Sequence, residues 1–230
     1  PFFKIFLYLT PGGTCIMAGK ISEKLYQDYL SSLLSGEKFT CRQIVQNLIG
    51  DKVELKDLYI NLFQRSLYEV GELWENNRIT VATEHLATTI TSNLMTLAYP
   101  LIFNTEKIGK KAIITAITNE YHQIGARMVA DLMELEGWDT FFLGSNTPIK
   151  DLEEMIREKE PDYLALSVAI YFNMSKLEEI LKRINLEFPD LQIVIGGQAF
   201  RWGGEDVVKK FDNVKLFKDM LLFEKFLKEI

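Results

Sequence analysis

The chain has 230 residues, which suffices for one large domain or two modest ones, and 47% of its residues are hydrophobic. Its 26 Lys and Arg residues and 32 Asp and Glu residues give a net charge of −6, with no basic block. Binding to nucleic acid is therefore not expected, because affinity for a phosphate backbone depends on clustered Lys and Arg.

The first segment, residues 1–19, is expected to be a non-native or disordered leader. Its apolar stretch is too short to span a bilayer and lacks the small-residue pattern of a signal cleavage site, so we expect no membrane association. Met17 follows Pro-Gly-Gly, and we expect residues 1–16 to come from upstream translation; a degenerate signal peptide is the alternative. Cys15 and Cys41 lack the spacing of metal ligands or of a disulfide framework, which favours a cytoplasmic location.

Residues 20–104 show the periodicity of amphipathic helices. From Leu55 to Trp74, apolar residues recur at intervals of three and four, which predicts one long helix. In all, the expected helices cover 21–34, 40–49, 55–74 and 79–102. Four such helices with short connections predict a four-helix bundle domain.

From residue 105 onward, short apolar runs alternate with helical segments. The expected strands are 112–117, 140–143, 163–168, 193–195 and 214–217. The expected helices lie near 124–136, 149–159, 174–187 and 204–211, with a last one from 219. Five short strands with helical crossovers predict a parallel sheet covered on both faces, which is an α/β domain of the flavodoxin or Rossmann-like kind over 105–230.

Unusual residues gather where the expected strands end. Glu120, His122 and Gly125 follow the first strand in the pattern E-x-H-x-x-G. The ends of the next three strands carry Gly144, Ser167, Gly196 and Gly197. Ligands of open parallel sheets bind beyond these ends, and small residues there leave room for a large, flat ligand. The dinucleotide fingerprint G-x-G-x-x-G is missing from the turn after the first strand, which disfavours a nicotinamide or flavin dinucleotide. A flavodoxin-like module that binds a flavin mononucleotide is the alternative.

His122 is one of two histidines in the chain and a candidate metal ligand. A single histidine makes a poor zinc site, but it suits a metal whose other positions are filled by a macrocycle. Glu120 can then accept the second N–H of the ring and fix its tautomer. The alternative is a histidine at a helix start whose ring is hydrogen-bonded and binds nothing.

These residues resemble the motifs of the cobalamin (B12)-binding domains of methionine synthase, corrinoid methyl-carrier proteins and B12-dependent photoreceptors. The family motifs are D-x-H-x-x-G, then S-x-L at the third strand and G-G at the fourth. The chain has Glu120–Gly125, Ser167–Ala169 and Gly196–Gly197 in the corresponding places. The resemblance implies a helical cap over a corrin that is bound by the Rossmann-like domain.

The resemblance also implies roles for single residues. Cobalamin would bind base-off, with His122 as the cobalt ligand supported by Glu120, and Gly125 would let the nucleotide tail pass. The residues expected to line the slot of the tail or to contact the cofactor nearby are Ser167, Gly196, Gly197 and Gly144. Glu in place of Asp adds one methylene, which we expect to weaken or bend the supporting hydrogen bond without removing it, and Ala169 replaces the Leu of the motif.

The second histidine, His85, belongs to a segment similar to the W-x9-E-H signature of B12 photoreceptor caps. That resemblance implies that Trp74 lies over the upper face of the corrin, with Glu84 and His85 beside the upper ligand. A tryptophan in the bundle core and a solvated Glu and His are the alternatives. Photoreceptors have a histidine directly after the tryptophan, whereas this chain has Glu75.

We therefore expect a cobalamin-binding protein, with methylcobalamin or adenosylcobalamin, that serves as a corrinoid methyl carrier rather than as a complete enzyme. Its partners would be methyltransferases. Glu75 favours this role, as does the short segment before the first helix, in which a winged-helix domain is not expected to fit. The alternative is a B12-dependent sensor or light-responsive regulator without its own DNA-binding domain. The oligomeric state and the upper ligand stay open.

Overall fold

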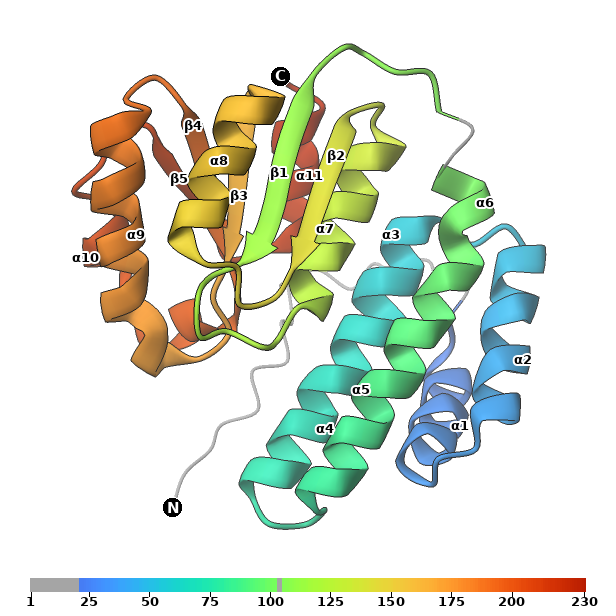
Figure 1. Cartoon of the computed structure of the whole chain (residues 1–230). Helices are drawn as coiled ribbons and strands as arrows, with labels where there is room; N and C mark the ends of the chain where they lie inside the picture. Colours follow the sequence, from blue (N-terminus) through green and yellow to red (C-terminus); the bar gives the residue numbers. More distant parts are fainter. Residues whose placement is uncertain (1–20, 103–104) are drawn as a thin grey trace, which may run out of the picture.

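The computed structural model describes residues 21–102 and 105–230; the predicted leader, 1–19, lies outside the described residues. A helical bundle is followed by an α/β half, and the change between them falls between Ile102 and Lys111 (Figure 1). Within the described residues no helix is both long and apolar enough to cross a membrane.

The bundle consists of four helical runs. They are α1 (Glu23–Leu34), α2 (Lys38–Gly50), the run α3 (Leu55–Asp57), η1 (Leu58–Gln64) and α4 (Arg65–Glu75), and the run α5 (Val81–Met95), η2 (Thr96–Ala98) and α6 (Tyr99–Ile102). The hydroxyls of Ser22 and Thr80 accept backbone N–H groups at the starts of α1 and α5, which fixes where these helices begin. The third run is not uniformly α-helical, because η1 is a π-helix.

The C-terminal half holds a five-stranded parallel sheet. Its strands are β1 (Lys111–Ala116), β2 (Asp139–Gly144), β3 (Tyr163–Ser167), β4 (Gln192–Gly196) and β5 (Val214–Phe217). They pair in the order β2-β1-β3-β4-β5, and each neighbouring pair is parallel. This confirms the predicted α/β fold. In this flavodoxin-like order the direction of winding reverses between β1 and β3, the place where such sheets bind ligands.

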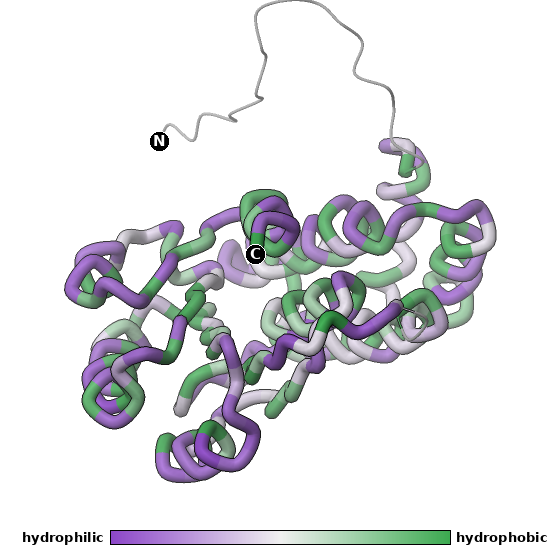
Figure 2. Tube along the Cα trace, turned by 90° about the horizontal axis from the view of Figure 1, so that it is seen from above, coloured by the Kyte–Doolittle hydropathy of each residue, from purple (hydrophilic) through white to green (hydrophobic). Residues whose placement is uncertain are grey.

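Helices cover both faces of the sheet (Figure 1). The helices of the α/β half are α7 (Ile124–Leu135), α8 (Ile149–Lys159), α9 (Met174–Glu187), α10 (Glu205–Val208) and α11 (Met220–Leu227), with the short η3 (Tyr171–Asn173) and η4 (Gln198–Trp202). Along β1, Ile113 packs into the core under α8 and α9, while Ile114 packs under α7 and α11. Hydrophobic and hydrophilic residues alternate within the turns of the helices, as expected for helices covered on one side (Figure 2).

Helix α7 joins the two halves, because it packs on both. Met128 and Leu132 belong to the core of the bundle, whereas Ala126, Ala130 and Met133 pack against the sheet. The bundle is thereby fixed against the α/β half, and its α4–α5 hairpin extends past the carboxyl ends of the strands (Figure 1).

Polar contacts reinforce this junction. The hydroxyl of Tyr59, in η1, donates to the carboxylate of Asp131 at 2.6 Å. Arg127 donates to the carbonyl of Ser92 at 3.0 Å and to the hydroxyl of Tyr99 at 2.8 Å. These side chains of α7 therefore bond to both long runs of the bundle.

Candidate functional site

The carboxyl ends of β1 and β3 lie side by side at the point where the winding reverses. Ala116 pairs with Ser167, and the N–H of Ile117 donates to the carbonyl of Ser167 at 3.2 Å. The loops that follow these strands therefore leave the sheet together. The first loop carries Glu120 and His122, so both lie at the edge of the sheet where a ligand is expected.

The carboxylate of Glu120 is fully buried and accepts five hydrogen bonds. Its Oε1 accepts from the N–H of His122 at 3.1 Å and lies 2.6 Å from Nδ1 of the same residue. Its Oε2 accepts from the N–H groups of Ala169 (3.0 Å) and Ile170 (2.9 Å) and from the side-chain amide of Asn173 (3.1 Å). Burial raises the pKa of Glu120, but the hydrogen bonds from His122 and Ile170 outweigh it and lower the pKa to about 2. Glu120 is thus a buried anion.

The imidazole of His122 is held on one side and open on the other. Its side chain is 58% exposed. Because Nδ1 faces an anionic oxygen at 2.6 Å, the proton of the neutral ring belongs on Nδ1, and the lone pair of Nε2 is free. The hydrogen bond to Glu120 raises the pKa of His122 against the opposing effect of burial, and the charges of Glu120 and Glu84 add to the rise.

This donor set fits one axial bond to a metal held by a macrocycle. An exposed Nε2, with Nδ1 bonded to a carboxylate, is the usual arrangement of a metal-ligating histidine. Among residues 21–102 and 105–230, no group of three His, Cys, Asp or Glu side chains could hold an ion by itself. A site of protein ligands alone, such as a structural zinc site, does not fit the described residues.

The glycines predicted for the site lie in two kinds of surroundings. At Gly197 φ is +123°, and a Cβ would lie 2.1 Å from the carbonyl oxygen of Val168, so the close approach of two loops requires glycine there. Added Cβ atoms at Gly144 and Gly196 would each have a neighbour at 3.0 Å. At Gly125, in the first turn of α7, a Cβ would meet nothing within 4 Å. Open space therefore borders α7 where it begins.

The three predicted cap residues lie on the α4–α5 hairpin. Trp74 is 45% exposed, so it does not belong to the bundle core. Glu84 lies 3.5 Å from Nε2 of His85, whose side chain is 74% exposed, and accepts the hydroxyl of Thr88 at 2.9 Å. The charge of Glu84, in the first turn of α5, contributes to the raised pKa of His122. The three residues therefore share one hairpin, which extends past the carboxyl ends of the strands (Figure 1).

Sequence reasoning missed three asparagines that build the loop of Glu120. The N–H of Asn146 donates to the carbonyl of Glu120 at 2.9 Å, and its side chain accepts the N–H of Asn119 at 2.8 Å. Both residues have positive φ, which asparagine tolerates better than most residues. Asn173 supplies the third contact, to Oε2 of Glu120. The signal in the sequence was an asparagine shortly after each of the first three strands.

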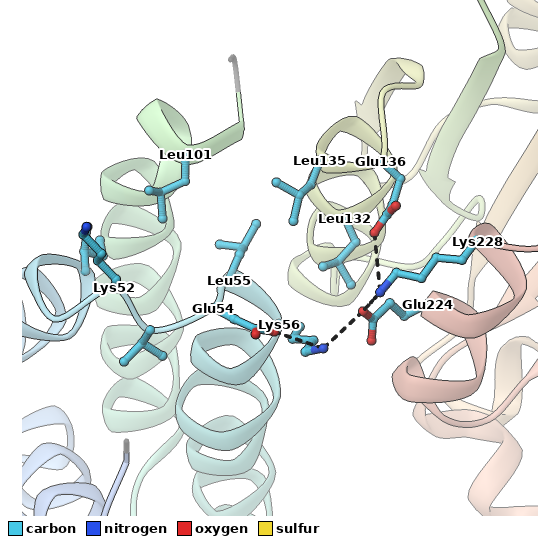
Figure 3. A pocket seen from close by; sticks show the side chains of 12 residues that line it. Lys52, Glu54, Leu55, Lys56, Leu101, Leu132, Leu135, Glu136, Glu224 and Lys228 are labelled. Carbon is cyan, nitrogen blue, oxygen red and sulfur yellow. Dashed lines mark hydrogen bonds and ion pairs between the residues drawn. The ribbon is translucent and has the colours of Figure 1, made fainter. Parts of the chain in front are cut away.

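A separate pocket of about 380 Å³ lies between the bundle and helices α7 and α11 (Figure 3). Its walls include Leu55, Leu101, Leu132 and Leu135. Ion pairs border it: Lys56 lies 3.4 Å from Glu224, and Lys228 lies 2.6 Å from Glu224 and 3.9 Å from Glu136. No residue predicted for the cofactor site lines this pocket, so it is a separate feature of the interface.

The chain combines a helical bundle with a doubly wound sheet, and it places an exposed histidine at the switch point, where the winding reverses between β1 and β3. These features define an α/β ligand-binding protein with a helical cap. Comparison with known families makes the class specific. Two family models match the chain, each described as a B12 binding domain, over residues 25–99 and 110–214. The chain belongs to the B12-binding proteins, which confirms the family expected from its motifs.

Curated relatives fall into two groups. The HTH-type transcriptional repressor CarH of Myxococcus xanthus is 28% identical over 137 residues, which are 59% of this chain and 45% of that protein. Trimethylamine corrinoid protein 1 of Methanosarcina acetivorans is 23% identical over 162 residues, or 67% and 74% of the two chains. Dimethylamine corrinoid protein 2 of the same organism is 21% identical over 186 residues, or 79% and 84%. The chain thus spans less than half of CarH but most of the two corrinoid proteins.

A solved structure supports the arrangement of the two halves. The monomethylamine corrinoid protein of Methanosarcina barkeri matches 90% of this chain and 99% of its own, with a TM-score of 0.76 and 17% identity. At this identity the likeness concerns the fold alone. It confirms a helical N-terminal region followed by a Rossmann-like domain.

Proposed function

We propose that the protein holds cobalamin base-off, with His122 as the lower ligand of cobalt. The observation that carries the proposal is the pairing of the His122 ring with the buried Glu120 carboxylate at 2.6 Å, which leaves Nε2 exposed at the switch point. A single donor, His122, would hold the cobalt of a corrinoid, because the macrocycle would supply other ligands of the metal itself. The B12 binding domain match over 110–214 includes this pair.

The remaining predicted residues have proposed places around the corrin. The nucleotide tail would be lined by Gly125, where open space borders α7, and by Gly144, Ser167, Gly196 and Gly197. On the cap side, Trp74, Glu84 and His85 would contact the cofactor on the side away from His122. Trp74 is 45% exposed, which supports a role outside the bundle core.

Glu120 has a defined part in this mechanism. Its anionic Oε1 keeps the proton on Nδ1, so that Nε2 presents its lone pair in one orientation. The backbone N–H groups that donate to Oε2 hold the carboxylate in place. The ring of His122, bonded to the same carboxylate, is therefore already oriented before the cofactor binds. When bound, the cofactor would supply a cobalt ion that can carry an alkyl group.

We further propose that the protein is a methyl carrier within a methyltransferase system, with methyltransferases as its partners and methylcobalamin as one of its forms. The alignments over 74% and 84% of the two methylamine corrinoid proteins support this role. Glu75 after Trp74, in place of the histidine expected in photoreceptors, supports it as well. In this role the protein is one component of an enzyme system and no complete enzyme by itself.

A light-responsive or B12-dependent sensor is the second candidate. Its support is the combination of Trp74, Glu84 and His85 on one hairpin, together with the 28% identity to CarH over 137 residues. In this role the bound form would be adenosylcobalamin.

Cobalamin ligation is tested with the two histidines as a matched pair. We expect His122→Ala to weaken cobalamin binding by at least the roughly 10- to 100-fold that loss of a ligand's direct partner costs, and to abolish the nitrogen splitting in the electron paramagnetic resonance spectrum of Co(II). His85→Ala serves as the control and should retain that splitting. An unchanged spectrum and affinity in His122→Ala would refute the proposed ligation, and a yellow flavin spectrum in the purified protein would favour the flavodoxin-like alternative.

The role is tested by illuminating the protein loaded with adenosylcobalamin and measuring its mass by light scattering. For a carrier we expect no change of oligomeric state. We also expect a purified corrinoid-dependent methyltransferase to transfer the methyl group of the methylcobalamin-loaded protein to the acceptor substrate of that enzyme. A light-induced change of mass would favour the sensor instead.

A further inference from the structure

We propose that Asn173 is a positioning residue of the lower-ligand site: it holds the Glu120 carboxylate against His122. This inference rests on the proposed function and assigns a new residue to it. Asn173 lies at the end of η3, directly before α9, and outside the stretches that match the family motifs.

The side-chain amide of Asn173 reaches two parts of the Glu120 loop. Its Nδ2 lies 3.1 Å from Oε2 of Glu120 and 3.4 Å from the carbonyl oxygen of Asn119. One amide group thus contacts both the carboxylate and the backbone one residue earlier. The start of α9 is thereby connected to the loop that carries the proposed cobalt ligand.

Asn173 differs in kind from the other donors to Oε2. Ala169 and Ile170 donate through backbone N–H groups, which any residue except proline would offer at those positions. The hydroxyl of Ser167, at the end of β3, is not among the donors to Glu120 in the described part of the chain. Besides His122 itself, Asn173 is therefore the donor to this carboxylate that depends on side-chain identity.

The position of Asn173 agrees with the length of the Glu120 side chain. Glutamate carries its carboxylate one methylene farther from the backbone than aspartate does. From the loop after β1, this carboxylate reaches the N–H groups that follow β3 and the amide at the start of α9. The amide of Asn173, three residues after Ile170, is therefore within reach of the longer glutamate side chain.

Removing the amide should loosen the carboxylate without removing it. The backbone donors stay, so Glu120 keeps two bonds to Oε2, but its position is less fixed. We expect Asn173→Ala to lower cobalamin affinity by about 3- to 10-fold, less than the roughly 10- to 100-fold typical for direct partners of a ligand. A larger share of bound Co(II) should lack the axial nitrogen splitting.

Asn173→Asp separates the hydrogen bond from packing. Aspartate has nearly the shape of asparagine, but it places a second acceptor, normally charged, opposite Oε2 of Glu120. We expect this variant to lose more affinity and more nitrogen splitting than Asn173→Ala. A role in packing alone predicts the reverse order, with Asn173→Asp close to wild type.

Asn185→Ala is the matched control, because Asn185 lies in α9, the helix that Asn173 directly precedes, and donates to the carbonyl of Leu181 at 3.0 Å. It should leave the spectrum and the affinity unchanged. Circular dichroism confirms that each variant is folded, and the splitting is measured on bound cobalamin only, so a lower yield of folded protein does not imitate the effect.

The outcomes separate this inference from the proposed function. A wild-type spectrum without nitrogen splitting would overturn the ligation by His122, and the inference with it. A split wild-type spectrum that both Asn173 variants reproduce at unchanged affinity would overturn the role of Asn173 alone. The role of Asn173 would also be overturned if Asn185→Ala lost as much affinity and splitting as the Asn173 variants. The same holds if Asn173→Asp behaved like the wild type while Asn173→Ala lost affinity.

Discussion

At the scale of single residues, Glu120 places a charged carboxylate in a fully buried position. Such a group is costly unless hydrogen bonds replace the water it loses. Here the ring and backbone of His122 satisfy Oε1, while Ala169, Ile170 and Asn173 satisfy Oε2. The same bonds that fix the His122 ring thus keep Glu120 ionised.

These bonds predict an acid-dependent loss of stability in the ligand-free protein. The pKa of Glu120 is about 2 when folded, against an ordinary value of 4.5, so its contribution is present above pH 4.5 and is lost as the pH falls toward 2. The shift corresponds to about 3 kcal/mol. His122, whose pKa is raised, is protonated in both states below pH 4.5 and does not contribute in this window.

Urea unfolding of the wild type and of Glu120→Gln measures this contribution. The difference between their free energies of unfolding should narrow by about 3 kcal/mol between pH 4.5 and pH 2. The other carboxylates titrate in both proteins, so their contributions cancel in the difference between the two free energies of unfolding. Parallel stability curves over this range would mean that Glu120 has no depressed pKa.

At the scale of elements, the first turn of α7 combines helix formation with open space. Gly125 lies in this turn, and a Cβ there would meet nothing within 4 Å. Gly125→Ala should stabilise the ligand-free protein by roughly 0.5–1 kcal/mol, because alanine favours a helix more than glycine does. If the nucleotide tail of cobalamin passes this point, the added methyl group should weaken cobalamin binding at the same time.

The thermal midpoint without ligand and the cobalamin dissociation constant together test this prediction. Gly197→Ala is the contrasting variant. Its φ of +123° and the clash of the added Cβ with the carbonyl oxygen of Val168 at 2.1 Å should lower the thermal midpoint even without cobalamin. Wild-type affinity in Gly125→Ala would place the tail elsewhere.

Elements and site differed in how far the sequence could predict them. The long helices and the strands were predictable because their periodicity is a property of neighbouring residues. The π-helical η1 was not, because it leaves the apolar stripe of its run intact, and α10 ends at Val208, earlier than expected. His122 and Glu120 were predictable from a short motif. Asn173 was not, because it meets Glu120 across 53 positions of sequence, through the adjacency of β1 and β3.

At the scale of the whole molecule, α7 makes the bundle and the α/β half depend on each other. Met128 and Leu132 complete the core of the bundle, although they belong to a helix of the α/β half. The bond between Tyr59 and Asp131 likewise exists only when both halves are folded. The proposed site lies between the α4–α5 hairpin and the strand ends, so its geometry depends on this junction (Figure 1).

This dependence predicts that the two halves unfold as one unit. Leu152, 2% exposed in α8, packs in the core on the face of the sheet away from α7, and Leu48, 3% exposed in α2, packs in the bundle. Replacing either by alanine should cost about 2–5 kcal/mol. We expect each variant to lower the hydrogen-exchange protection of β3 amides and of α1 amides by the same free energy, because opening one half removes the packing of the other. Native-state exchange measured by mass spectrometry on both variants tests this, and loss of protection confined to the mutated half would show that the bundle unfolds independently of the sheet.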